Sequence, residues 1–128
     1  MNLGLHSFTC IFVFLIFSSA VETKPIEKDI AEIKILNKIS AKVSILNIEV
    51  NKSYKFDSLN IMIFACYKNP PEEIPEDFVL LKIFDKVNQL NQKLIYQGWM
   101  ISSSPSTTPL EHPIYDLWIK SCKTDKDS

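Results

Sequence analysis

The chain of 128 residues has no arginine, two glycines and two histidines. All fourteen basic residues are lysine, so the planar fork with which arginine grips phosphate and carboxylate groups is absent. A formal net charge of −1 gives no basic footprint, and we expect no nucleic-acid partner. Beyond residue 20 the only glycine is Gly98, which argues against the G-x-S-x-G turn of a serine hydrolase. A single histidine there, with no C-x-x-C pair, argues against a zinc site.

The N-terminal region contains an apolar run, Phe8–Phe17, which Ser18-Ser19-Ala20 follows. The small residues Ser18 and Ala20 suit the −3 and −1 positions of a leader-peptidase site. We therefore predict a secretory signal over residues 1–20 and export to the periplasm or cell envelope. Met1–Ser7 carry no Lys or Arg, so an uncleaved anchor is the alternative, and we expect membrane association only in that form.

Cys66 and Cys122 are the cysteines left after cleavage, an even pair in an oxidising compartment. We predict that they form a disulfide, which closes a loop of about 57 residues and stabilises the domain by roughly 4 kcal/mol. On the last predicted strand Cys122 shares parity with Asp116 and Lys120, opposite to the apolar positions. We therefore expect the disulfide at the strand end or past a bulge, outside the central core.

Alternating patterns and turn signals predict short strands through most of the mature chain. Ile26, Ile30 and Ile33 also fit a short helix. Leu46 interrupts the alternation of its strand, which indicates a bulge or a change of face. Residues 59–67 are apolar on both faces, as in a central buried strand. The predicted strands are 42–45, 47–50, 53–56, 59–67, 78–84, 94–101 and 114–122.

Three prolines between Lys68 and Asp77 cannot donate to a strand ladder, so this segment is predicted to be an exposed acidic loop. No internal repeat is visible. The predicted organisation is a flexible lead-in over residues 21–31, a β-domain over 32–122 and a polar tail over 123–128. The fold class is all-β, as one small antiparallel sandwich or barrel.

Rare residue types gather between Gly98 and Cys122, including both tryptophans. Trp and Tyr dominate binding hot spots, so this segment is a candidate surface for an envelope protein or a glycan. The alternative is that the indoles fill the core, as is usual in small β-domains. We expect no cofactor and a non-catalytic binding or structural module. The candidate binding residues are Trp99, Met100, Glu111, His112, Tyr115, Asp116 and Trp118.

A hydrolase-like site is the enzymatic alternative. In it His112 acts as general base for one of Ser102–Ser104 or Ser106, oriented by Asp116 or Glu111. The missing nucleophile turn disfavours this hypothesis. The serines suit turns and hydroxyl-to-backbone bonds, and the histidine suits a hydrogen bond to a neighbour in a turn.

A weak metal site is a further alternative. Glu111 and His112 are adjacent and would point to opposite faces of an extended chain unless Pro113 provides a turn toward Asp116. The acidic loop lacks the alternating ligands and the glycine of a calcium loop. We expect solvated surface in both places. The acidic side chains of the loop are Glu72, Glu73, Glu76 and Asp77.

A set of motifs occurs in a specific order along most of the mature chain. They are Pro70-Pro71-Glu72-Glu73, Pro75-Glu76, Gly98-Trp99-Met100, Ser103-Ser104-Pro105, Leu110-Glu111-His112-Pro113, Tyr115-Asp116, Trp118 and Cys122. This order resembles the alphaproteobacterial family called domain of unknown function 2155, over about residues 35–122. The chain departs from it at Ile101-Ser102, where we expect Phe-Ala, and at Asn37, where we expect Asp. The resemblance implies an exported bacterial protein with a signal sequence and no established activity.

Overall fold

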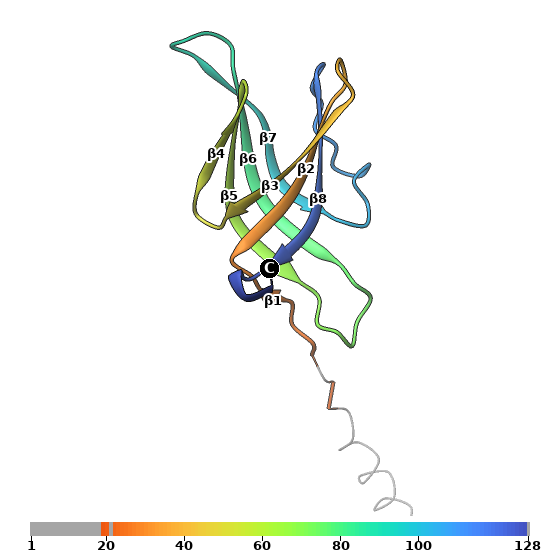
Figure 1. The fold of residues 1–128 in the computed structure, drawn as a ribbon. Coiled ribbons are helices and arrows are strands. Elements are labelled where there is room, and N and C mark those ends of the chain that lie inside the picture. Colours follow the sequence, from red (N-terminus) through yellow and green to blue (C-terminus); the bar gives the residue numbers. More distant parts are fainter. Residues whose placement is uncertain (1–18, 21, 128) are drawn as a thin grey trace, which may run out of the picture.

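The computed structural model describes residues 19–20 and 22–127, which contain two antiparallel sheets packed face to face (Figure 1). The larger sheet has the order β1-β5-β6-β7, with β4 also paired to β5, and the smaller has the order β3-β2-β8. Two separate sheets make the fold an antiparallel sandwich, which confirms the predicted all-β class. The strands are β1 (Ile26–Glu27), β2 (Ile30–Asn37), β3 (Lys42–Glu49), β4 (Ser53–Phe56), β5 (Leu59–Lys68), β6 (Asp77–Lys86), β7 (Gln92–Ile101) and β8 (Tyr115–Lys123).

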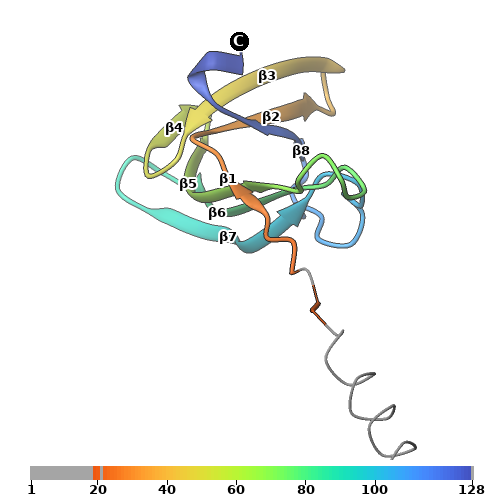
Figure 2. The same cartoon turned by 90° about the horizontal axis from the view of Figure 1, so that it is seen from below.

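The core lies between the two layers, which separate clearly when the domain is seen from below (Figure 2). Alternate residues of each strand point inward, as the pleat of a strand requires. The larger sheet contributes Leu59, Ile61, Ile63, Val79, Leu81, Ile83 and Met100, and the smaller contributes Ala31, Ile33, Ile35, Leu46, Ile48, Leu117 and Ile119. Aliphatic side chains with branched carbons fill most of this core, which fits the strand preference of such residues.

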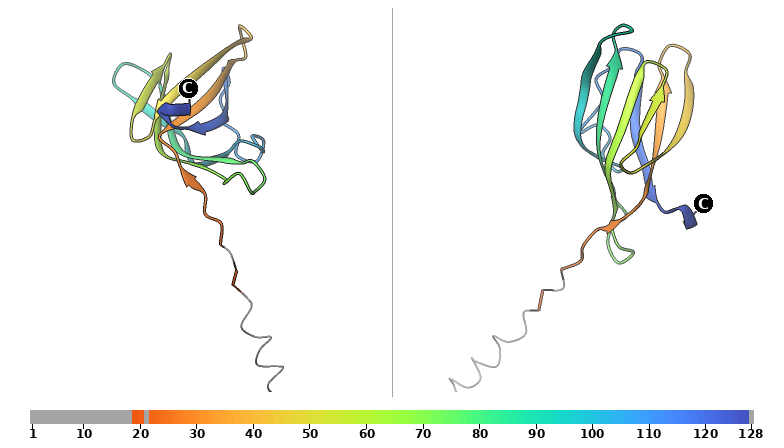
Figure 3. Two further views of the ribbon diagram at one scale, coloured as in Figure 1. Left: turned by 60° about the horizontal axis from the view of Figure 1, so that its bottom comes forward. Right: turned by 90° about the vertical axis from the view of Figure 1, so that its left-hand side faces the viewer.

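The chain passes between the layers through β1 to β2, β3 to β4, and the long connection of residues 102–114 before β8. Figure 3 shows the two layers from two further sides. In the described residues there is no helix with the length and apolarity of a transmembrane span. The predicted leader falls on residues 1–20, of which only Ser19 and Ala20 belong to the described part of the chain.

Cys66 of β5 and Cys122 of β8 form a disulfide between the sheets, which confirms the predicted pairing. Each cysteine follows a β-bulge by two residues. Ile63 pairs with Leu81 and Ala65 with Leu80, which leaves Phe64 as the extra residue of β5.

Lys120 is the corresponding extra residue of β8. Its neighbours Ile119 and Ser121 pair with the consecutive residues Ile33 and Glu32 of β2. The two bulges turn both cysteines inward, and both are fully buried in the core cluster. The expected bulge before Cys122 is therefore present, but the expectation of a disulfide outside the central core is wrong. The extra residue shifts the inward and outward alternation of β8 by one position, and the Cys122 side chain therefore points into the core.

The structure differs from two further expectations about the strands. Strand β3 pairs with β2 without a register shift, so Leu46 marks no bulge. Leu46 faces inward on a regular strand, and the exposed Val43 and Ile45 face outward. Residues 59–67 are buried on one face only, since Phe64 is exposed and Met62 is half-buried on the other.

The lead-in also contains structure that its polar composition does not indicate. Ile26 and Glu27 pair with Lys68 and Tyr67 of β5, and β2 begins at Ile30, so these residues form strands and no helix. At the other end of the chain β8 includes Lys123, and a 3₁₀ turn, η1 (Asp125–Asp127), follows it. Lys28 lies 3.6 Å from the Asp127 carboxylate, which joins the two ends of the described chain.

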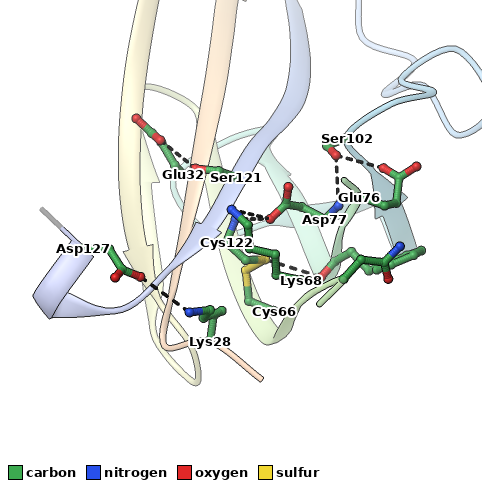
Figure 4. A network of polar contacts seen from close by, with 12 residues as sticks. Lys28, Glu32, Cys66, Lys68, Glu76, Asp77, Ser102, Ser121, Cys122 and Asp127 are labelled. Carbon is green, nitrogen blue, oxygen red and sulfur yellow. Dashed lines mark hydrogen bonds and ion pairs between the residues drawn. A yellow bond between two sulfur atoms is a disulfide. The ribbon is translucent and has the colours of Figure 1, made fainter. Parts of the chain in front are cut away.

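The acidic loop is anchored at its C-terminal end (Figure 4). Asp77 is only 7% exposed, and its Oδ1 accepts a 2.8 Å hydrogen bond from the Cys122 backbone N–H. Burial by itself would raise the pKa of Glu76, but hydrogen bonds from Ser103 and Ser102 outweigh it and hold that pKa below its usual range. The expectation of a solvated surface is therefore wrong for these two carboxylates, and the loop tip at Glu72 and Glu73 is exposed.

Candidate functional site

The segment between Gly98 and Cys122 reaches three separate parts of the sandwich. Trp99 lies on the outer face of the larger sheet, whereas Met100, next to it, is in the core. His112 and Tyr115 are buried together near one end of the sandwich, where their rings stack at 5.3 Å. Glu111 is exposed, and Asp116 and Trp118 are half-buried on the outer side of β8. The seven candidate binding residues thus do not share one site.

His112 is 8% exposed and uses both ring nitrogens within the protein. Its Nδ1 accepts hydrogen bonds from the backbone N–H groups of Ile114 and Tyr115, each at 3.1 Å. The ring proton therefore lies on Nε2, which donates to Asp85 Oδ2 at 3.1 Å. A general base needs a free lone pair toward its substrate, and this histidine has none. His112 therefore fixes the start of β8 to the end of β6.

Two carboxylates, the exposed Asp57 and the half-buried Asp85, bind these two buried rings. We call the four residues the His112 cluster: Asp57, Asp85, His112 and Tyr115. Burial alone would raise the pKa of Asp85, but hydrogen bonds from Ser58 and His112 hold that pKa below its usual range. The Tyr115 hydroxyl donates to Asp57. That hydrogen bond, reinforced by burial, raises the pKa of Tyr115 to about 12.

This shift predicts a loss of stability at alkaline pH. The folded state holds the Tyr115 phenol in its neutral form, so the contribution is complete below the ordinary tyrosine pKa of about 10 and disappears as the pH rises through about 12. Two pKa units correspond to about 3 kcal/mol. Urea unfolding between pH 10 and about 12 should show this loss of unfolding free energy in the natural chain and not in Tyr115→Phe. Lysine titration is common to both proteins, and equal losses in the two would contradict the assignment.

The residues of a serine hydrolase triad are engaged elsewhere. Ser102 and Ser103 both donate hydrogen bonds to the Glu76 carboxylate. Asp116 pairs with Lys38 at 3.2 Å, and the same ammonium donates to the His112 carbonyl at 2.6 Å. The histidine is oriented by Asp85 of β6, and neither Asp116 nor Glu111 contacts its ring nitrogens in the described structure. The geometry therefore does not assemble the hydrolase-like site.

Metal ligands do not converge either. Within residues 19–20 and 22–127, no group of three or more His, Cys, Asp and Glu side chains is placed to hold an ion. His112 has no free ring nitrogen, and the loop carboxylates Glu76 and Asp77 already accept hydrogen bonds from Ser102 and Cys122. Of the residues of the weak metal site, His112 and Asp116 are thus engaged in structural contacts, and Glu111 is exposed.

The outer side of the larger sheet carries many apolar side chains. Strand register places its outward residues opposite one another on β5, β6 and β7, and each is half-buried or exposed. Apolar side chains that gather on an exposed face mark interaction sites in many proteins. We call these residues the aromatic face: Met62, Phe64, Tyr67, Phe78, Leu80, Phe84, Leu94, Trp99 and Ile101.

Trp99 of the edge strand β7 is 44% exposed on this face. Its ring lies 6.0 Å from that of Tyr67, and together with Phe78 and Pro25 the two rings line a shallow, open hollow. Pro25 enters because β1 pairs with β5 at Tyr67. Tyr96 donates a 2.9 Å hydrogen bond to the Trp99 carbonyl, which holds the backbone at this position of β7. An indole exposed on a rigid strand is the type of residue that anchors binding surfaces.

The sequence singles out Trp99 but not Tyr67, Phe78 or the other aromatic residues beside it. A usable signal is present, because the strands at 59–67 and 78–84 are apolar on both faces. That pattern is typical of burial on both sides. It also fits a strand with one face in the core and the other on an apolar surface, which is the arrangement found here.

Comparison with known proteins matches residues 31–122 to the family described as uncharacterized protein conserved in bacteria, DUF2155. The chain is also 32% identical over 87 residues to the uncharacterized protein RP359 of Rickettsia prowazekii strain Madrid E. That alignment covers 68% of this chain and 56% of the rickettsial protein, so the chain spans little more than half of that relative. No solved structure matches. Since the family match covers most of the chain, the protein is a member of the DUF2155 family of uncharacterized bacterial proteins.

Proposed function

We propose that this protein is an exported, non-catalytic module of the bacterial envelope that binds a partner through its aromatic face. The observation that carries the proposal is the half-exposed Trp99 beside Tyr67 in an apolar hollow. The buried disulfide supports export, because such bonds persist in oxidising compartments and are rare in the cytosol.

The chemistry of the hollow favours an apolar partner surface. Pro25, Tyr67, Phe78 and Trp99 line it, and only the Tyr67 hydroxyl and the indole N–H are polar side-chain groups among them. A glycan site needs several convergent hydrogen-bonding groups to orient its hydroxyls. Of the two partner classes that the sequence suggests, the glycan therefore has less support.

Truncation of the anchor residue tests the binding role. We expect Trp99→Ala to reduce the amount of partner that co-purifies with the protein from native envelope by at least about tenfold, as for a hot-spot tryptophan. Quantitative mass spectrometry after chemical cross-linking would measure partner relative to the tagged protein. The melting temperature should stay nearly unchanged, since this side chain lies outside the core.

Val43→Ala provides the matched control. Val43 has a similar exposed fraction, 47%, but lies on β3 of the other sheet. Its partner recovery should equal that of the natural chain. Equal recovery from Trp99→Ala and from the natural chain would remove the aromatic face from the binding role.

Export makes a separate prediction about the N-terminus. Protein taken from the envelope should have an intact mass that begins at Val21, because Ser18 and Ala20 satisfy the small pockets of the leader peptidase. The control is the same chain with Ala20→Leu, which should keep its first twenty residues. Full-length natural chain in the membrane fraction would instead indicate an anchor.

A further inference from the structure

We infer that the partner of the aromatic face is a lipid bilayer surface that carries anionic headgroups. This inference rests on the proposed binding function and names its partner. The contact surface consists of the aromatic face together with the β6–β7 hairpin tip, residues 86–93. It would hold the domain flat against a membrane by its larger sheet.

The first observation is the type and exposure of the apolar residues. Trp99, Phe64 and Leu94 are all between about a third and a half exposed on the sheet. The hairpin tip adds Val87 at 64% and Leu90 at 94% exposed. Tryptophan and tyrosine concentrate at the boundary between lipid and water, where an apolar ring and a polar atom are both satisfied.

The second observation is the sign of the charges. By register the outward positions of β6 include Lys82 and Lys86, whereas its one acidic residue past Asp77, Asp85, faces inward to His112. Residues 86–110 contain two lysines, Lys86 and Lys93, and no Asp or Glu. Lysines near a membrane surface are attracted to anionic lipid headgroups by about 1 kcal/mol each.

Of the carboxylates near the face, Asp57 and Asp85 lie at the hairpin end and bind Tyr115 and His112, and two others lie at the opposite end. Glu27 of β1 pairs with Tyr67, and Glu73 of the acidic loop accepts a hydrogen bond from Thr23. Lys82 places its ammonium 5.6 Å from the centre of the Phe64 ring, so its stem covers the apolar sheet while its charge stays at the surface. The outward lysines of β6, Lys82 and Lys86, therefore give this side of the sheet positive charge, which suits a negatively charged plane.

The third observation concerns the shape of the surface. The Trp99 hollow is shallow and open, and a helix would find no walled groove there. A peptide added as a strand needs a free edge, but the Trp99 carbonyl of edge strand β7 already accepts the Tyr96 hydroxyl. An open sheet face, with one carbonyl of its edge strand already bonded, fits a planar surface better than a peptide.

The two tryptophans of the chain allow a direct test. In protein purified from its native cells, Trp118→Phe leaves Trp99 as the only indole, and Trp99→Phe leaves Trp118 on the outer side of the other sheet. Each would be mixed with vesicles of brominated phosphatidylcholine, with or without phosphatidylglycerol. We expect lipid bromine to quench Trp99 on the anionic vesicles and to leave Trp118 unquenched. Equal quenching of the two indoles, or equal quenching of Trp99 on both vesicle types, would overturn the inference.

Charge variants test the lysines. Lys82→Gln and Lys86→Gln should each weaken partition onto the anionic vesicles by roughly fivefold. Lys34→Gln is the matched control, because Lys34 is an exposed lysine opposite Trp118 on the smaller sheet. A full effect in the control, or none in the two face variants, would contradict the proposed surface.

A final arm separates this inference from the proposed function. Acrylamide quenching of Trp99 would be measured in lipid-free protein, first with the co-purified partners bound and then after their removal. If a co-purified protein shields Trp99 while vesicles do not quench it, the binding module stands and the lipid inference fails. If no co-purified protein shields Trp99 and the vesicles do not quench it, the proposed binding function and the lipid inference both fail.

Discussion

Replacing Cys66 and Cys122 together by alanine should lower the free energy of unfolding by about 4 kcal/mol. The bond joins residues 56 apart, so its loss frees a long loop in the unfolded chain. Both side chains are also packed in the core, and their removal leaves a small cavity. Because a domain of this size has a net stability of only about 5–15 kcal/mol, the change should be obvious in urea unfolding.

Reduction provides the control for this result. The natural chain unfolded in the presence of dithiothreitol should lose nearly the same stability, whereas the double variant should not respond to the reductant. A double variant that unfolds at the same urea concentration as the oxidised natural chain would show that the bond contributes nothing. Recovery of two free thiols from native protein would contradict the bond itself.

Replacing His112 by alanine should cost about 3 kcal/mol, the second largest effect that we expect. The change leaves the Ile114 and Tyr115 N–H groups and one Asp85 oxygen without their partner at a buried site. It also removes the stacked neighbour of the Tyr115 ring. Thermal unfolding would show the loss as a lower melting temperature.

Two conservative variants divide this effect between the ring nitrogens. Asparagine places a carbonyl oxygen near the Nδ1 position, so His112→Asn should keep the acceptor for β8 and lose the bond to Asp85. Glutamine reaches toward the Nε2 position, so His112→Gln should keep a donor for Asp85 and lose the acceptor. We expect both to be more stable than His112→Ala. Unchanged melting in all three variants, with loss of a hydrolytic activity, would overturn the structural role.

Some properties of this fold follow from local pattern. The prolines between Lys68 and Asp77 exclude a continued strand ladder there, and an even pair of cysteines after a predicted signal predicts the disulfide. Strand positions follow from the alternation of apolar residues. These features depend on residue types and on neighbours along the chain, so the amino-acid sequence alone predicts them.

Face assignment is harder, because alternation shows that a strand has two sides but not which side meets the core. Val43 and Ile45 are as apolar as Leu46 and Ile48, yet the first pair faces solvent. The bulges at Phe64 and Lys120 exchange the faces of the residues that follow them. A bulge depends on how two strands meet, and one strand's sequence carries little trace of it.

The candidate site is difficult to predict for the same reason. Residue type alone identifies Trp99, but its neighbour Tyr67 lies 32 positions away and is brought beside it by β6. His112 and Asp85 are 27 residues apart and meet only when β8 packs near the end of β6. The hydrogen bond between them distinguishes a structural role of His112 from a role as general base. Sequence spacing can propose each residue but not its partner.

The pairing of β2 with β8 has a consequence for how the protein is made. Ile30 aligns with Lys123 and Asn37 with Tyr115, so the first long strand of the chain waits for the last. A polypeptide is synthesised from its N-terminus, and contacts between such distant residues form slowly. Until β8 has emerged, one edge of β2 lacks its hydrogen-bonding partner and Cys66 lacks its disulfide partner. The sandwich therefore cannot be completed until nearly the whole chain has been synthesised, and such late folding suits the export that we propose.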